Sequence, residues 1–184
     1  GWTRRIISTQ GGVVCEPFYN KVLDFAMEFY VAHGSIECVG YSLFETDSRG
    51  IYKGNCLASN EEIERRLSVY INPEILGRTR NALMQELLKL ANGIYQGYLG
   101  VDMMVVHNAD GYALHPCVEV NWRMNMGVVS RLFFDRYMSP ASSGSYVIEF
   151  YPNKGEALNF HEEMKRKYPL RLQEGRLAEG YLSL

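Results

Sequence analysis

The residues best suited to chemistry in this sequence lie in one stretch, between Gly100 and Arg123. Asp110-Gly111, in the middle of this stretch, is a strong signal for a two-residue β-hairpin turn. With these two residues as the turn, Asp102 lies directly across the hairpin from Glu119. Side chains placed in this way are about 4.5–5.5 Å apart at Cβ. The sequence therefore predicts a facing pair of carboxylates.

The alternation of residues along this predicted hairpin separates a polar face from an apolar face. By the two-residue period of a strand, Asn121 and Arg123 follow Glu119 on the polar face. The opposite face is expected to lie in the core because it holds only apolar side chains: Val101, Met103, Val105, Val118, Val120 and Trp122.

Two acidic side chains that face each other across a hairpin destabilise it unless something neutralises them. A magnesium ion could do so, since it takes oxygen ligands at about 2.0–2.1 Å, usually from one or two carboxylates plus substrate phosphates. Arg123 could do so instead, in a surface ion-pair ladder that contributes at most about 1 kcal/mol. The pattern by itself leaves both interpretations open.

The order of these residues resembles the C-terminal signature of the ATP-grasp superfamily, in Gly100-Val-Asp102 followed by Glu119-Val-Asn121-Trp-Arg123. Most members are ATP-dependent ligases that join a carboxylate to an amine or thiol through an acylphosphate. The resemblance implies that Asp102, Glu119 and Asn121 bind two Mg²⁺ ions on the phosphates of ATP. It also makes Arg123 the catalytic candidate, facing the transferred phosphate or the acyl intermediate. Phosphoryl transfer depends mainly on such positioning and charge neutralisation.

The resemblance extends upstream, to the segment Val13 to Phe18. This segment is similar to the family's hinge strand, whose backbone pairs with adenine, which implies nucleotide contacts for Glu16, Pro17 and Phe18. Asp24 stands where the family places an acidic residue on the ribose hydroxyls. The alternative for Glu16 and Asp24 is ordinary turn chemistry.

Lys53 matches a position of the family's pattern, whereas residues 1–12 depart from that pattern. Lys53 stands where some members place a basic residue on the γ-phosphate, with Asn55 as a second candidate; the alternative for Lys53 is a solvent-exposed edge-strand lysine. Residues 1–12 contain neither the family's phosphate-binding lysine nor its glycine-rich loop. We therefore expect a fragment that lacks the N-terminal nucleotide-binding lobe and is inactive in isolation. A non-catalytic module of the same fold, which binds nucleotide or a partner, is the alternative.

Periodicity and capping signals predict the elements that must position these residues. Between Asp24 and Val31 alternate residues are apolar, which predicts a half-buried strand whose second face is polar and includes Glu28. Ser59 with Glu62, and Asn72 with Pro73, are N-terminal helix signals. Strands are predicted over 13–16, 24–31, 36–44, 51–57, 99–106, 113–122 and 146–151, and helices over 60–70, 73 to near 97, 126–137 and 154–167.

This order of elements favours an α+β fold with a largely antiparallel sheet flanked by helices. The resemblance adds the ATP-grasp C-terminal subdomain, with residues 1–138 as the C-terminal half of the domain and 144–184 as a short C-terminal α/β extension of it. Its implied ligands are ATP, Mg²⁺ and a small carboxylate or amine substrate.

Composition bounds the remaining possibilities. The chain has 184 residues, 47% of them hydrophobic and 22% charged, which is typical of a globular protein. The net charge of −2 lacks the basic excess expected of a nucleic-acid or acidic-membrane binder, and no apolar run is long enough to cross a membrane. The four cysteines include no Cys-x-x-Cys pair, so we expect free thiols and a cytoplasmic protein. The oligomeric state leaves no signal in the sequence.

Overall fold

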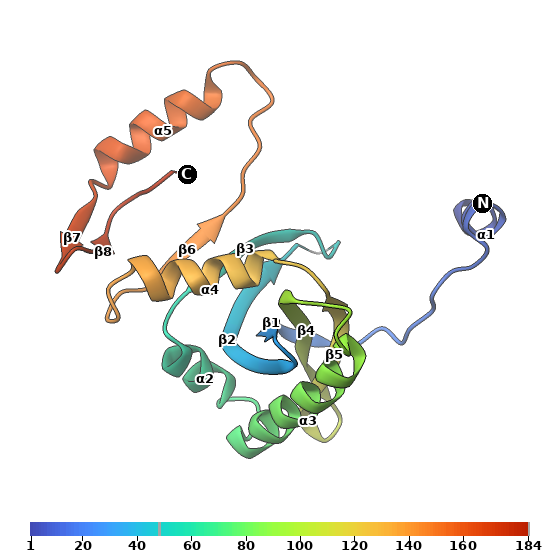
Figure 1. Cartoon of the computed structure of the whole chain (residues 1–184). Helices are drawn as coiled ribbons and strands as arrows, with labels where there is room; N and C mark the ends of the chain where they lie inside the picture. Colours follow the sequence, from blue (N-terminus) through green and yellow to red (C-terminus); the bar gives the residue numbers. More distant parts are fainter. Residues whose placement is uncertain (48, 184) are drawn as a thin grey trace.

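The computed structural model describes residues 1–47 and 49–183, and over these residues it is an α+β protein (Figure 1). The elements in chain order are α1 (Trp2–Gln10), β1 (Lys21–Ala32), β2 (Ser35–Thr46), β3 (Tyr52–Leu57), α2 (Asn60–Leu67), α3 (Pro73–Ala91), β4 (Gly97–Asn108), β5 (Gly111–Asn121), α4 (Met126–Tyr137), β6 (Gly144–Val147), α5 (Glu156–Lys167), β7 (Arg171–Gln173) and β8 (Arg176–Glu179). None of the described helices is long and apolar enough to cross a membrane.

Six strands form one antiparallel sheet in the order β5-β4-β1-β2-β3-β6. In Figure 1 the sheet is strongly curved, with α4 above it and α2 and α3 below it. The core on the side of α2 and α3 includes Phe25, Met27 and Phe29 of β1, each fully buried. The predicted α+β class with a largely antiparallel sheet is therefore confirmed.

Three of the helices begin where the sequence analysis predicts. The Ser59 hydroxyl accepts a hydrogen bond from the Glu62 backbone amide at 3.2 Å, and Asn72 caps α3 with Pro73 in its first turn. Asn125 caps α4 by accepting from the Val128 amide at 2.9 Å. Each cap satisfies a backbone donor that the first helical turn leaves free.

The prediction of a solvent-facing polar side on β1 is wrong. Ala26 is 1% exposed and Glu28 is fully buried, because α4 packs across that face of the strand. A Cβ atom on Gly127, in the first turn of α4, would overlap both the Glu28 carboxylate and the Ser42 hydroxyl. The missing side chain therefore allows the close approach, and both faces of β1 are covered.

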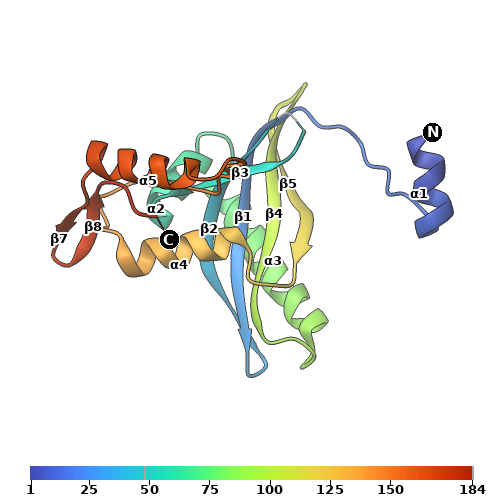
Figure 2. The same cartoon turned by 90° about the horizontal axis from the view of Figure 1, so that it is seen from above.

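The N-terminal twenty residues also differ from expectation. The strand predicted over 13–16 is absent, and residues 12–20 carry no regular structure. The helix α1, which we did not predict, has no buried residue and lies away from the sheet in both views (Figures 1 and 2). Glu16, Pro17 and Phe18 are all exposed.

Several other element boundaries differ from the predicted ones, and the ends of α3 and β6 and the start of α5 are examples. α3 ends at Ala91 instead of near residue 97, because Asn92 adopts the left-handed conformation that ends a helix. β6 ends at Val147, where its pairing with β3 stops. α5 begins after Gly155 instead of Asn153, whose side chain instead donates to the Glu156 carboxylate at 2.6 Å.

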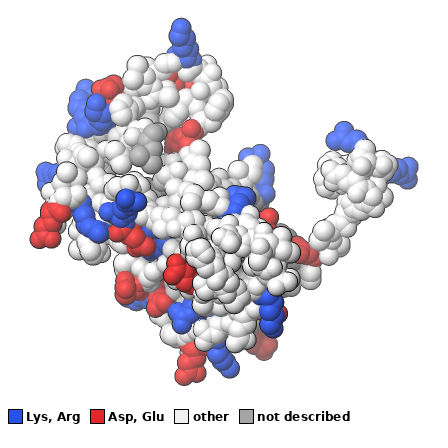
Figure 3. All heavy atoms as spheres, viewed as in Figure 1, with Lys and Arg blue, Asp and Glu red and all other residues white. Residues whose placement is uncertain are grey.

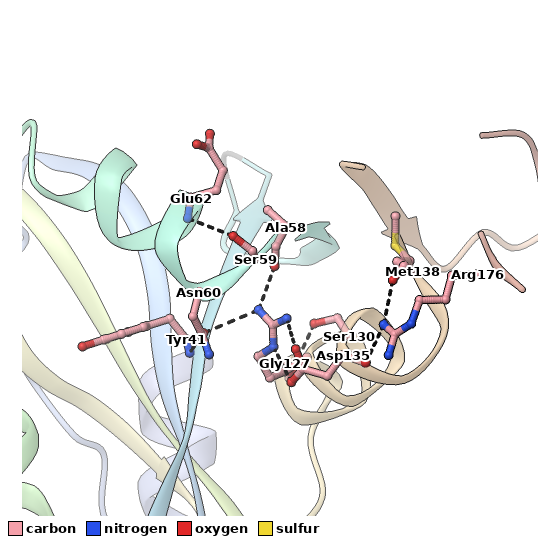
Figure 4. Close-up of polar contacts among 11 residues, drawn as sticks. Tyr41, Ala58, Ser59, Asn60, Glu62, Gly127, Ser130, Asp135, Met138 and Arg176 are labelled. Atoms are coloured by element: carbon pink, nitrogen blue, oxygen red, sulfur yellow. Dashed lines mark hydrogen bonds and ion pairs between the residues drawn. The ribbon is translucent and has the colours of Figure 1, made fainter. Parts of the chain in front are cut away.

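The C-terminal segment attaches to the end of α4. An Arg176 guanidinium nitrogen donates to the backbone carbonyls of Asp135 and Met138, at 3.0 and 2.9 Å (Figure 4). The Ser139 amide donates to the Leu177 carbonyl at 2.7 Å. Together with β6 at the sheet edge, these bonds connect residues 144–183 to the rest of the chain; the proposed domain boundary itself stays a prediction.

A buried arginine connects α4 to the junction of β3 and α2. Arg131, 2% exposed, donates to the Ala58 carbonyl at 2.7 Å and forms an ion pair with Asp135 at 2.5 Å. Figure 4 shows Ala58, Asn60 and Asp135 gathered at this point. The side chain of Asn60 in turn accepts from the Tyr41 amide of β2 at 2.9 Å.

Arg131→Leu is expected to lower the free energy of unfolding by about 1–3 kcal/mol, the cost of leaving the buried Ala58 carbonyl without a donor. Asp135 adds little to this cost because its side chain is half exposed and can be hydrated. Urea unfolding monitored by circular dichroism measures the change. Arg136→Leu, on the exposed side of the same helix, is the control and should change stability by less than about 0.5 kcal/mol. Equal losses in the two variants would contradict the role of Arg131.

Candidate functional site

The β4–β5 hairpin pairs Asp102 directly with Glu119, as predicted. The turn, however, lies one residue earlier than predicted, because Asn108 pairs with Gly111. A bulge compensates for this difference: between the pairs Met104–His115 and Asp102–Glu119, three residues of β5 face one residue of β4. The turn and the bulge each displace the register by two residues, so they keep every polar side chain on its predicted face.

The bulge nevertheless corrects the prediction for Val118. Val118 is 45% exposed and lines the cavity described below, whereas Val101 is fully buried and Val120 packs partly buried against the core. Val118 is one of the three β5 residues that lie between the two ladder pairs. Residues within a bulge lose regular alternation, which explains why strand parity failed there.

A chain of hydrogen bonds links the polar residues of the hairpin. Arg123 Nη2 donates to Asn121 Oδ1 at 3.1 Å, and Asn121 Nδ2 donates to Asp102 Oδ2 at 3.1 Å. Within the part of the chain that the structure describes, Arg123 forms no ion pair within 4.0 Å of Asp102 or Glu119. The arrangement therefore differs from a surface ion-pair ladder, and Asn121 lies between the cationic and anionic groups.

The facing carboxylates are only partly neutralised. Burial, followed by the negative charge of Glu119, raises the pKa of Asp102 from 3.8 to about 6, and the Asn121 hydrogen bond and Arg123 oppose this rise. Two carboxylates and an amide oxygen are ligands that a hard cation such as Mg²⁺ prefers. The described residues include no group of three or more His, Cys, Asp or Glu side chains that could hold a metal. The donor set therefore fits a cation that takes its remaining ligands from water or substrate phosphates.

These residues line a cavity of about 490 Å³ over the face of the sheet that α4 partly covers. Asp24 lines the same cavity and lies on β1 two residues before Ala26, which pairs with Asp102. Asp24 Oδ2 accepts from Lys21 Nζ at 2.5 Å and from the Thr46 hydroxyl at 2.9 Å. The structure thus brings together five of the predicted site residues: Asp24, Asp102, Glu119, Asn121 and Arg123.

Four predicted site residues lie outside this cavity. Glu16, Pro17 and Phe18 belong to the exposed irregular segment, and Lys53 is exposed on β3. Lys53 is the extra residue where the register of β3 against β2 shifts, between the pairs Thr46–Tyr52 and Glu45–Gly54. A one-residue shift in register moves the side chains that follow to the opposite face of the sheet. The nucleotide contacts assigned to these four residues stay predictions.

Asn55 occupies the cavity wall on β3. It is 3% exposed, its Oδ1 accepts from the Tyr52 hydroxyl, and its Nδ2 has no hydrogen-bond partner among the described residues. A buried amide donor without a partner carries a desolvation penalty. A ligand oxygen in the cavity would remove that penalty.

Glu28 is a cavity residue that sequence reasoning did not assign to the site. Its carboxylate accepts from the Ser42 hydroxyl at 2.7 Å and from Asn125 Nδ2 at 3.2 Å. Burial is the main cause that raises its pKa from 4.5 to about 7. The only sequence signal was an acidic residue between large apolar neighbours, which the alternation assigned to a solvated face.

The pH dependence of stability should report on Glu28. The folded protein holds the Glu28 proton more tightly than the unfolded chain does, so the contribution of Glu28 to stability is highest below about pH 4.5 and falls as the pH rises to about 7, by at most roughly 3 kcal/mol. Glu28→Gln should remove this fall. Asp102→Asn should remove a separate fall at lower pH, between about pH 4 and 6. Urea midpoints from pH 4 to 8 test both; an unchanged slope above pH 5 in Glu28→Gln would contradict the assignment.

In comparisons with known proteins, no family model and no curated protein matches this chain. Charge on the surface is mixed: on the face shown in Figure 3, acidic and basic side chains are interspersed. A function therefore has to be inferred from the residues that line the cavity and from their geometry.

Proposed function

We propose that this chain is the C-terminal part of an ATP-grasp domain and contributes the metal-binding half of an ATP- and Mg²⁺-dependent carboxylate–amine ligase. The observation that carries the proposal is that Asp102 and Glu119 face each other across β4 and β5 and, among the described residues, neither forms an ion pair with a lysine or arginine. Asn121 and Arg123 follow on the same face in the order that the family's motif requires. The Asp24 carboxylate in the same cavity further supports a nucleotide as the ligand.

In this proposal the side-chain oxygens of Asp102, Glu119 and Asn121 would hold the two Mg²⁺ ions that accompany the phosphates of ATP. Bound Mg²⁺ supplies the positive charge that neutralises the phosphate oxygens during transfer. The Arg123 guanidinium, now bonded to one amide oxygen, has further donors free for a phosphate or acylphosphate. Asp24 exchanges its Thr46 hydroxyl partner for a ribose hydroxyl.

The remaining nucleotide contacts belong to the same proposal. Glu16, Pro17 and Phe18 would contact adenine and Lys53 the γ-phosphate, as the family resemblance implies. Because residues 12–20 carry no regular structure, the adenine contacts need this segment to become ordered around the nucleotide. The proposal specifies the acyl substrate and the amine acceptor only as small molecules. The expected location of the reaction is the cytoplasm.

The test is interception of the acylphosphate by hydroxylamine. The protein, with any sequence that natively flanks this chain, is incubated with MgATP, hydroxylamine and a panel of carboxylic acids. A ligase releases ADP and forms a hydroxamate with one class of acid, and Asp102→Asn abolishes both products. Asp110→Asn, at the exposed tip of the same hairpin, is the control and should retain them. Nucleotide binding without ADP release for any acid would instead support the non-catalytic binding module.

A further inference from the structure

A buried polar network lies beneath the metal-binding end of the cavity. At its centre is the fully buried Glu28 carboxylate, which accepts one hydrogen bond from Ser42 of β2 and one from Asn125. Asn125 is itself only 8% exposed. Two strands and the start of α4 therefore meet at one carboxylate.

Two glycines allow the backbone to approach this carboxylate closely. A Cβ atom on Gly100 would overlap both the Glu28 carboxylate and the Asn125 amide, and one on Gly127 would overlap Glu28 and Ser42. Gly100 and Gly127 therefore lie directly against the Glu28 carboxylate, where any larger residue would displace it. Glu28 is fixed in place by packing as well as by hydrogen bonds.

The hydrogen bond to Glu28 also determines which way the Asn125 amide points. Because Nδ2 donates to Glu28, Oδ1 faces the helix and accepts from the Val128 amide at 2.9 Å, which caps α4. Only three residues separate Asn125 from Asn121, and this short connection contains Arg123. At one end of this connection Asn121 belongs to β5, and at the other end Asn125 is hydrogen-bonded to Glu28.

We propose that Glu28 is a positioning residue for the metal-binding motif: through Asn125 it fixes the segment that carries Asn121 and Arg123 against the Asp102–Glu119 pair. The inference rests on the proposed function, since it assigns a cation to that pair. Burying a carboxylate that has only two neutral hydrogen-bond donors lowers the free energy of unfolding. A role in the site would explain why the fold nevertheless contains this group. Groups that orient metal ligands typically change metal affinity 10- to 100-fold when they are altered.

Mn²⁺ binding to the chain tests the inference without any turnover. Binding is measured as the loss of the electron paramagnetic resonance signal of free Mn²⁺. Glu28→Asp keeps the charge but is too short to reach both Ser42 and Asn125, and it should weaken Mn²⁺ binding by about tenfold or more. Glu28→Gln keeps the shape but replaces one of the two acceptor oxygens with an amide nitrogen that cannot accept a hydrogen bond, and it should weaken binding similarly. The double variant E28Q/N125D reverses the direction of the hydrogen bond, keeps an N-cap oxygen, and should restore affinity to within about threefold.

A control separates positioning from loss of stability. Ser130→Ala removes another buried hydrogen bond of α4, from the Ser130 hydroxyl to the Gly127 carbonyl, at a position outside the cavity lining. It should lower the melting temperature and leave Mn²⁺ affinity within about threefold. If it weakens Mn²⁺ binding as much as Glu28→Asp does, the positioning role is wrong.

Two further outcomes distinguish the failure of this inference from the failure of the proposed function. Parental affinity in Glu28→Asp, with weak binding in Glu28→Gln, would show that only the charge of Glu28 matters and would overturn the inference. Identical Mn²⁺ binding by the parent chain and Asp102→Asn would instead overturn the metal site of the proposed function, and the inference with it.

Discussion

Replacing Glu119 with glutamine is expected to abolish most of the Mg²⁺-dependent turnover of the proposed ligase. The substitution preserves shape but removes one of the two negative charges that face each other across β4 and β5. A metal ion contributes several kcal/mol of charge stabilisation in the transition state. At 1.36 kcal/mol for each factor of ten, a weakened metal site corresponds to a loss of at least roughly 10²-fold in kcat.

The measurement is ADP release as a function of Mg²⁺ concentration, with ATP held constant. Glu119→Gln should shift the Mg²⁺ dependence to higher concentration as well as lower the maximum rate. Glu86→Gln, an exposed glutamate on α3, is the matched control and should behave like the parent. An unchanged Mg²⁺ titration in Glu119→Gln would identify the polar face of the hairpin as structural.

Replacing Arg123 with lysine should separate binding from chemistry. Lysine keeps the positive charge but loses the planar fork that can bind a phosphate or acylphosphate through two parallel hydrogen bonds. We expect ATP binding to survive and turnover to fall by roughly 10²–10³-fold, the size seen when one preorganised donor is lost from an active site.

Isothermal titration calorimetry with ATP and steady-state ADP release together check this expectation. Arg49→Lys, on an exposed turn arginine paired with Asp47, is the control for a general arginine effect. Parental activity in Arg123→Lys would mean that Arg123 serves only to hold Asn121, with which it shares its one side-chain hydrogen bond among the described residues.

Local sequence signals were sufficient to place the starts of α2, α3 and α4. Ser59, Asn72 and Pro73 mark helix starts through bonds made within one turn, and the structure contains those bonds. α4 begins and ends at the predicted residues, Met126 and Tyr137. The N-terminal segment was predicted wrongly because its apolar run from Val13 to Cys15 has no packing partner, and a short apolar run forms a strand only when another strand pairs with it.

The strand period was also sufficient to collect the polar groups of the hairpin on one face. Asp102, Glu119 and Asn121 share a face even though the turn was misplaced, because the turn and the bulge each shift the register by two residues. Lys53 illustrates the opposite case. A shift of a single residue at the Glu45–Thr46 position of β2 leaves Lys53 outside the cavity, and such a shift depends on the neighbouring strand.

Away from the register irregularities at Val118 and Lys53, the sequence by itself determined which residues share a face, because side-chain direction along a strand or helix follows from the local backbone geometry. Only the tertiary structure decided which faces are covered. Glu28 alternates with apolar residues as a solvated glutamate would, yet it is fully buried because α4 crosses β1 where Gly100 and Gly127 leave space for its carboxylate. Burial depends on segments about 70 to 100 residues away in the chain, and the alternation of one strand contains no information about them.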